Sequence, residues 1–210
     1  MTAPDPDAGR ARFAAATEAH LTAPLADGVI LRHVDHDELT RQLDELWRDG
    51  PRPGARLERV ISDDERARSG DLNAVLGTPL SHRILLEASG AVIGAYWGAQ
   101  EDAGRYYMVN SIVRQDHRGH GLYARLLARV VLAARDAGFH VIYSRHRATN
   151  NAVLVPKLRA GFLIAGFEVA PRHGVLVHLR KYLQDGAARA FEYRIDGAHG
   201  EALRASGFID

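Results

Sequence analysis

The chain contains no cysteine among its 210 residues, and this absence excludes disulfide bonds, zinc–thiolate sites and a cysteine nucleophile. Aromatic residues make up only 7% of the sequence, and no apolar run approaches the roughly 20 residues that a membrane-spanning helix needs. Residues 1–12 also lack the apolar stretch of a signal peptide. These absences predict a cytoplasmic protein with no membrane partner.

Charge of one sign is not in excess either. The chain carries 27 Lys plus Arg against 26 Asp plus Glu, which argues against nucleic acid as a partner. Its 11 histidines include two pairs at a spacing of three, His33 with His36 and His117 with His120. Both pairs cross predicted strand-to-helix turns and have no third ligand at a matching spacing, so the sequence predicts no metal site.

Hydrophobic periodicity predicts alternating strands and helices, and therefore an α/β fold. Strands are expected over 29–34, 83–88, 91–99, 105–113, 140–145, 162–169 and 174–182, with a hairpin turn at Ser89-Gly90. Helices are expected over 11–21, from Asp35 or Asp37 to Arg48, over 62–68 (with a capping box of Ser62 and Glu65), from Gly121 to about 137, over 150–160 and over 201–205. Residues 1–10 are expected to form a mobile leader and 49–55 a loop, and Pro156 suits its helix only in the first turn.

The most informative local pattern is the turn Arg118-Gly119-His120-Gly121, which joins a strand ending at Val113 to a long helix. The first N–H groups of a helix lack partners and lie at the positive end of its dipole. Glycine lets an anion approach those groups, and Arg118 adds a cation beside them. The pattern favours a phosphate-binding turn, with glycines that merely close the turn as the alternative. It matches neither a Walker loop nor a dinucleotide fingerprint.

The segment 111–121, Ser-Ile-Val-Arg-Gln-Asp-His-Arg-Gly-His-Gly, resembles the strand-and-turn motif of the GCN5-related N-acetyltransferase (GNAT) superfamily. Downstream, Asn150, Lys157 and Gly161-Phe162 resemble the second motif of that family, a helix that starts at Asn and ends at Gly-Phe. The resemblance covers 28–182 and implies an α/β fold with a mixed central sheet, splayed between two strands and flanked by helices. This would be one acyltransferase domain with extensions at 1–27 and 183–210.

Acetyl-CoA is the co-substrate of this family, and the turn binds its pyrophosphate. The resemblance implies that role, mainly through backbone N–H groups, for Arg118, Gly119, His120, Gly121, Leu122 and Tyr123. It also implies that Ile112 and Val113 pair with the pantetheine arm as an added strand would, and that Asn150 contacts the arm.

Two positions depart from the family pattern. Tyr123 replaces a small residue at the end of the first motif, which alters the surroundings of the phosphate. Lys157 stands where the family usually carries a tyrosine that protonates the leaving thiolate. A lysine suits this role only if burial lowers its pKa from about 10.4, so the identity of the general acid stays open.

Three further residues are candidates for proton transfer or for binding the acceptor. Tyr107 lies where some family members carry a base on this strand, and packing within the sheet is the alternative interpretation. His146 follows the strand predicted over 140–145 and titrates near neutral pH, unless it is an ordinary loop histidine. Tyr143 lies on the same strand, with core packing as its alternative.

The charge of the acceptor is not decided by the sequence. Acidic residues over 63–65 could attract a cationic amine, although acids also favour a solvated helix start. Arg145 and Arg147 could instead receive an anionic acceptor.

The resemblance implies an acetyl-CoA-dependent N-acetyltransferase that acts on a primary amine of a small molecule or peptide. The amine would attack the thioester directly in a ternary complex, with the backbone N–H of Val113 on the oxyanion. The alternatives are a catalytically silent coenzyme-A-binding sensor and a transferase for longer acyl chains, with a wider tunnel beside Val109 and Ser111. A homodimer is compatible with the tail 185–210, which could cover the edge of a partner.

Overall fold

The computed structural model describes residues 5–48, 62–170, 173–198 and 200–207. The elements in chain order are α1 (Pro6–Leu21), β1 (Val29–His33), α2 (His36–Leu46), α3 (Asp63–Leu76), β2 (Ser81–Ala88), β3 (Ala91–Gln100), β4 (Arg105–Val113), the 3-10 turn η2 (Gln115–His117), α4 (Leu122–Asp136), β5 (Val141–Arg147), α5 (Asn151–Arg159), β6 (Leu163–Ala170), β7 (Gly174–Tyr182), α6 (Asp185–Asp196) and α7 (Gly200–Ala205). The loop predicted over 49–55 falls outside the described residues.

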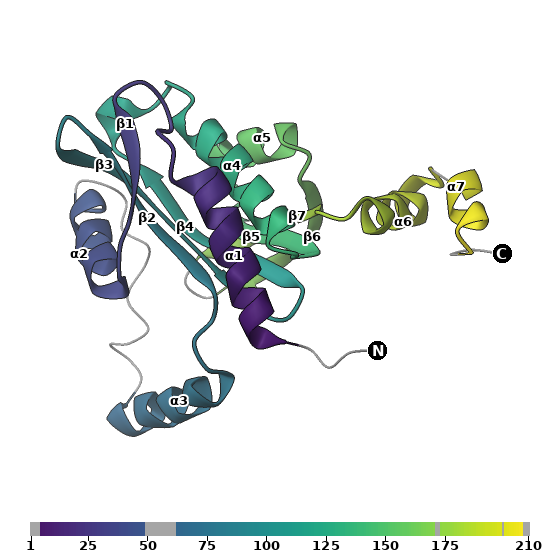
Figure 1. Ribbon diagram of the computed structural model, residues 1–210, viewed down its shortest axis with the longest axis horizontal. Coiled ribbons are helices and arrows are strands. Elements are labelled where there is room, and N and C mark those ends of the chain that lie inside the picture. Colours follow the sequence, from purple (N-terminus) through teal and green to yellow (C-terminus); the bar gives the residue numbers. More distant parts are fainter. Residues whose placement is uncertain (1–4, 49–61, 171–172, 199, 208–210) are drawn as a thin grey trace.

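One mixed sheet of seven strands organises the fold, in the order β1-β2-β3-β4-β5-β7-β6 (Figure 1). Neighbouring strands are antiparallel except for β4 and β5, which run parallel. A parallel pair needs a crossover connection, and α4 supplies it. The predicted α/β fold with a mixed, helix-flanked central sheet is confirmed.

Helices cover both faces of this sheet. On one face α1 and α4 lie side by side, and α4 buries the apolar stripe that contains Leu122, Leu126 and Val130 (Figure 1). On the other face α2 packs through Leu39 against Leu85, Ala95 and Ile112. The sheet is therefore sandwiched between two hydrophobic cores of unequal size.

An irregularity in β4 changes which side chains face each core. Trp97 pairs with Asn110 and Gly98 pairs with Met108, so Val109 is an extra residue in β4. Met108, before this bulge, belongs to the core beneath α4. After it, Ile112 belongs to the core beneath α2. The bulge therefore reverses the face of the sheet to which the side chains in the second half of β4 point. This half of β4 belongs to the candidate active site described below.

Several element boundaries differ from the predicted ones. α1 starts at Pro6 rather than residue 11, because the Asp5 carboxylate accepts hydrogen bonds from the N–H groups of Asp7 and Ala8 (2.9 and 3.3 Å). The capping box of Ser62 and Glu65 is confirmed, but its helix, α3, continues to Leu76. The sequence pattern did not predict α6, and β5 reaches Arg147 rather than residue 145.

Pro156 lies in the interior of α5, as its sixth residue, and not in the first turn, the one position where it would suit the helix. Proline cannot donate the N–H that would bond one turn back, so it weakens this short helix. α5 ends at Arg159, and Gly161 follows with a left-handed φ of 80°. The helix is anchored from within by two buried residues, Leu154 and Lys157.

Hydrogen-bonded polar side chains run through the larger core, and the lack of a side chain at Gly98 leaves the space that they occupy. The hydroxyl of Tyr96 donates to that of Tyr106 (3.3 Å), which also contacts Nδ1 of His82 at 2.7 Å. A Cβ at Gly98 would overlap both phenol oxygens. We expect Gly98→Ala to lower the free energy of unfolding by about 1–3 kcal/mol in a urea titration, because overpacking displaces the tyrosines.

A matched control for this substitution is Gly166→Ala in β6, where a Cβ meets nothing within 4 Å. That variant should unfold at nearly the wild-type urea concentration. Equal stability of the two variants would contradict this prediction. It would show that the side chains around Tyr96 can accommodate the added methyl group with no loss in the free energy of unfolding.

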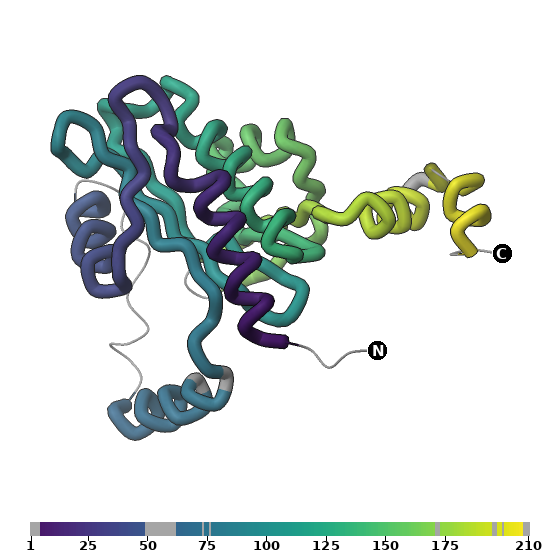
Figure 2. The backbone as a smooth tube through the Cα atoms, in the orientation of Figure 1, coloured from purple at the N-terminus to yellow at the C-terminus, as the bar shows by residue number. Residues whose placement is uncertain are grey.

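The C-terminal helices α6 and α7 extend from the end of β7 away from the sheet (Figure 2). Among the helices of the described residues, none is long and apolar enough to cross a membrane. In the same part of the chain no three His, Asp or Glu side chains gather so as to hold a metal ion.

Candidate active site

The turn before α4 has the geometry of an open anion site. Gly119 and Gly121 adopt left-handed φ values of 84° and 74°, which let the chain turn sharply into the helix. Gly121 is the N-cap residue of α4, and no side chain forms a capping hydrogen bond at this end of the helix. The first N–H groups of α4 therefore stay available to a ligand, at the positive end of its dipole.

Arg118 ties this turn to the end of β4. Its Nε donates to the carbonyl oxygen of Val113 at 2.7 Å, which holds the guanidinium beside the helix N-terminus. His120 contacts the carbonyl of His117 at 3.4 Å and remains exposed. The structure thus brings together Arg118, Gly119, His120 and Gly121 at the start of α4, as the sequence predicts.

The central sheet is splayed between β4 and β5. These strands pair only from Arg105 with Val141 to Tyr107 with Tyr143, although β4 continues to Val113 and β5 to Arg147. Beyond Tyr107, the backbone of β4 on this side has no strand partner among the described residues. An extended ligand can hydrogen-bond to such an edge as an added strand does. We call the opening between the two strands the fork.

The amine of Lys157 lies at the closed end of the fork. It comes from α5, and its side chain is only 1% exposed. Its Nζ donates to Ser144 Oγ on β5 at 2.6 Å and to Met108 Sδ on β4 at 3.0 Å. The ring of Phe162 lies 4.7 Å away. The Lys157 amine therefore donates to both β4 and β5 at the point where these two strands separate.

Burial, with no carboxylate partner among the described residues, lowers the pKa of Lys157 to about 7. Of the 27 Lys and Arg residues in the chain, only Lys157 and Lys181 are lysine. An arginine could not lose its proton here, since its pKa exceeds 12. A lysine with a pKa near 7 can both give and take a proton at neutral pH. A lysine suits the role of general acid only if burial lowers its pKa, and Lys157 has such a lowered pKa.

His146 continues this contact through Ser144. It lies within β5 rather than in a loop after it, and its Nε2 is 2.9 Å from Ser144 Oγ. Burial, together with the nearby Lys157, lowers the pKa of His146 to about 3. The ring is therefore neutral at pH 7 and can accept the Ser144 hydroxyl proton. A group this weakly basic is poorly suited to deprotonate an ammonium.

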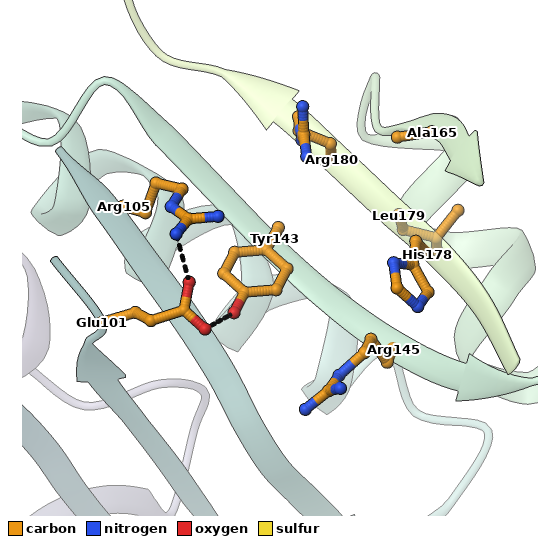
Figure 3. A pocket seen from close by; sticks show the side chains of 8 residues that line it. All are labelled: Glu101, Arg105, Tyr143, Arg145, Ala165, His178, Leu179 and Arg180. Atoms are coloured by element: carbon orange, nitrogen blue, oxygen red, sulfur yellow. Dashed lines mark hydrogen bonds and ion pairs between the residues drawn. The ribbon is translucent and has the colours of Figure 1, made fainter. Parts of the chain in front are cut away.

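Tyr107 and Tyr143 lie on the opposite face of the sheet from Lys157. Their rings stack at 4.8 Å between centroids, and the guanidinium of Arg145 lies 5.2 Å from the Tyr107 ring. The Tyr143 hydroxyl donates to Glu101 (Figure 3). Burial and that carboxylate raise the pKa of Tyr143 well above its usual range, so its phenol stays protonated. These side chains line a face that an acceptor could approach.

The other predicted contacts of the coenzyme differ in what they offer. The side chains of Ile112 and Leu122 are buried, so only their backbones are accessible. The phenol of Tyr123 packs against the larger core, its hydroxyl buried beside Ser111. Its ring therefore does not crowd the turn. Asn150 is exposed at the start of α5, and its side chain caps no backbone group there.

Ser144, Met108 and Glu101 were missed by sequence reasoning. One signal was available for Ser144: the alternation of β5 places Ile142, Ser144 and His146 on one face. Met108 and Glu101 carry no local signal, because their roles depend on how β4 meets α5 and β5 in space.

The Acetyltransferase (GNAT) family profile matches residues 40–162, more than half of the chain. The chain belongs to this family, as the motifs of the turn and of α5 had suggested. It is 30% identical over 111 residues to the L-amino acid N-acyltransferase MnaT of Escherichia coli (strain K12). That match covers 51% of this chain and 63% of MnaT, less than two thirds of the relative.

Solved structures share the fold at low sequence identity. The yncA protein of Salmonella typhimurium, solved with its cofactor acetyl-CoA, superposes with a TM-score of 0.54 at 19% identity, over 75% of this chain and 95% of that one. The spermidine/spermine N-acetyltransferase SpeG of Vibrio cholerae gives 0.56 at 15% identity, over 79% and 99%. Ard1 of Thermoplasma volcanium gives 0.56 at 11% identity, over 75% and 99%.

Proposed function

We propose that the protein is an acetyl-CoA-dependent N-acetyltransferase in which a primary amine attacks the thioester directly in a ternary complex. The observation that carries this proposal is the amine of Lys157, which is buried at the closed end of the fork and has no carboxylate partner in the part of the chain that the structure describes. A buried lysine without an ion-pair partner destabilises a fold, so its position beside the parallel pair of β4 and β5 calls for a chemical role. The name of MnaT, an N-acyltransferase, supports the same reaction class.

The residues around the fork fit acetyl-CoA in two respects. The uncapped start of α4 offers backbone N–H groups to the pyrophosphate, and Arg118 adds a guanidinium beside them. The unpaired edge of β4 near Ile112 and Val113 offers hydrogen bonds to the pantetheine arm. Asn150 would contact the same arm from the start of α5. When bound, the coenzyme supplies an activated acetyl group as a thioester.

Lys157 would act as the general acid. As the amine nitrogen bonds to the acetyl carbon and the carbon–sulfur bond breaks, Lys157 delivers a proton to the departing thiolate sulfur. The proton that the incoming neutral amine loses on forming the amide then returns to the neutral Lys157 amine, so the overall charge is unchanged. The Ser144 hydroxyl, which accepts from Lys157 and faces neutral His146, holds the Lys157 amine toward the fork. Tyr107 and Tyr143 would line the acceptor side, where their phenols can order the amine or a water.

A first experiment compares two thioesters that differ only in the nucleotide end. Wild-type protein is titrated with acetyl-CoA and with S-acetylpantetheine, and thermal unfolding is followed. We expect acetyl-CoA at 100 times its Kd to add about 2.7 kcal/mol to the free energy of unfolding, and S-acetylpantetheine to need far higher concentrations. Equal affinity for the two thioesters would remove the pyrophosphate site from the proposal.

Transfer is then measured as thiol release with a panel of primary amines. Release that depends on the amine, with acetylated product in equal amount, is the expected result. Coenzyme binding without transfer to any amine would instead indicate a silent coenzyme-A sensor. Faster release from longer acyl-CoA substrates would indicate a transferase for longer chains.

A further inference from the structure

A shallow pocket of about 190 Å³ lies on the face of the sheet that carries Tyr143, opposite to Lys157. Side chains from the four strands β4 to β7, and Glu101 just after β3, line it, as Figure 3 shows: Glu101, Arg105, Tyr143, Arg145, Ala165, His178, Leu179 and Arg180. Tyr143 is the last residue of β5 that pairs with β4, so the pocket borders the closed end of the fork. Of its lining residues, the proposed function uses Tyr143 alone, on the acceptor side.

Carboxylates engage two of the three guanidiniums that line this pocket, since Arg105 pairs with Asp102 at 2.6 Å as well as with Glu101, and Arg145 pairs with Glu168. Glu101 is shared between Arg105, at 3.3 Å, and the hydroxyl of Tyr143. The neighbouring Glu168 is shared between Arg145, at 3.2 Å, and His178, at 2.9 Å. Each of these two carboxylates is thus already engaged by two donors.

Arg180 is the third guanidinium of the pocket. It lies directly across from Tyr143 in the register of β5 with β7, and it is half-buried. No side chain among the described residues forms an ion pair or hydrogen bond with it. Arg105 is paired with Glu101 and with Asp102, and Arg145 with Glu168, so Arg180 is the guanidinium of the pocket whose donors stay available to a ligand. A guanidinium presents a planar set of donors that fits a carboxylate or a phosphate in a bidentate way.

We infer that this pocket binds an anionic group of the acceptor, with Arg180 as its main contact. This inference rests on the proposed function and adds the class of acceptor: a small amine that also carries a carboxylate or phosphate. With that group at Arg180, the rest of the molecule lies over Tyr143 and Tyr107, toward the fork. Polycationic amines are disfavoured, since they offer no anion to Arg180 and its guanidinium would repel them.

The inference is tested with matched acceptors. Wild-type protein is assayed with a set of L-amino acids, with the corresponding amino acid amides, with O-phosphoethanolamine beside ethanolamine, and with spermidine. We expect the anionic members to be acetylated with at least about tenfold higher kcat/KM than their neutral partners, and spermidine to be poor. A preference for O-phosphoethanolamine over the amino acids would assign the pocket to phosphate rather than carboxylate.

The variant Arg180→Gln distinguishes a role of the pocket in binding anionic acceptors from a general loss of activity. We expect about a 10–100-fold loss of kcat/KM for the anionic acceptors, mainly through KM, because one charge-assisted bidentate contact is lost. The neutral amides and the Kd for acetyl-CoA should stay unchanged. Arg159→Gln removes the same charge from the exposed end of α5 and serves as the matched control. Equal losses for acids and amides, or none in Arg180→Gln, would overturn the inference.

The pocket can be tested even if no amine is acetylated. Wild-type and Arg180→Gln proteins are then titrated with N-acetyl amino acids and with their amides, and chemical shift changes are followed by NMR. Saturable binding of the acids alone, lost in Arg180→Gln, would support the pocket while the proposed function fails. Absence of binding by the acids would reject the pocket itself.

Discussion

Lys157→Met is expected to reduce kcat by about 10²–10⁴-fold and, at the same time, to make the protein more stable at pH 7. Methionine fills a similar volume but carries no charge and needs no hydrogen bond. The amine that it replaces is 1% exposed and contacts only Ser144, Met108 and the ring of Phe162 among the described residues. The loss of activity follows because the departing thiolate no longer has a proton donor.

The gain in stability has a defined pH dependence. The pKa of Lys157 falls from 10.5 in the unfolded chain to about 7 in the fold, so between these values the unfolded chain binds more protons. Stability of the wild type therefore rises as the pH increases from 7 to 10.5. Each pH unit in this window corresponds to at most about 1.4 kcal/mol. Below pH 7 the full penalty is present, and Lys157→Met should remove it.

The matching activity profile is expected to have an alkaline limb near pH 7, since a general acid must be protonated to work. Lys181→Met is the control, because Lys181 is the other lysine of the chain and donates to the carbonyl of Ala160 at 3.0 Å. Urea titrations between pH 7 and 10 and pH profiles of kcat measure both effects. A Lys157→Met variant that is stabilised yet fully active would leave Lys157 without a catalytic role.

Much of the fold could be predicted because its signals are local. The strands β2 to β4 follow from alternation and from the hairpin at Ser89-Gly90, whose φ values are 50° and 78°. The start of α4 follows from Gly119 and Gly121. By contrast, α6 lies in a Gly/Ala-rich tail whose composition obscured it, although its sequence is amphipathic and Gly197 ends it with a left-handed φ of 76°. The early start of α1 depends on the single carboxylate of Asp5, which the mobile-leader prediction overlooked.

The candidate site was predicted only in part, for a similar reason. The position of Lys157 could be recognised from the Asn150-to-Phe162 motif, but its surroundings could not. Ser144 and Met108 reach it because β4 and β5 separate just beyond Tyr107, and α5 passes over the gap. The strand predicted over 140–145 ends two residues before β5 does, and so it leaves His146 just outside. In the longer strand it is half-buried and faces the lysine, which explains its low pKa.

Arg118→Glu is expected to weaken acetyl-CoA binding by at least about 100-fold. The reversal removes a cation beside the uncapped N-terminus of α4 and places a carboxylate where the pyrophosphate would lie. A charge-assisted hydrogen bond contributes about 1.5–3 kcal/mol, and repulsion between like charges adds to its loss. The affinity for S-acetylpantetheine, which lacks the pyrophosphate, should change much less.

The loss in Arg118→Glu must be separated from damage to the fold and from a change in overall charge. Arg10→Glu makes the same change on the exposed surface of α1, and Arg118→Gln removes the cation without adding an anion. Calorimetric titration should rank the Kd values as wild type and Arg10→Glu, then Arg118→Gln, then Arg118→Glu. If raised salt weakens wild-type binding toward that of Arg118→Gln, the contact is electrostatic, because salt screens an exposed ion pair. Equal Kd values for all four proteins would mean that the glycines only close a turn, and that the fork holds its ligand without the start of α4.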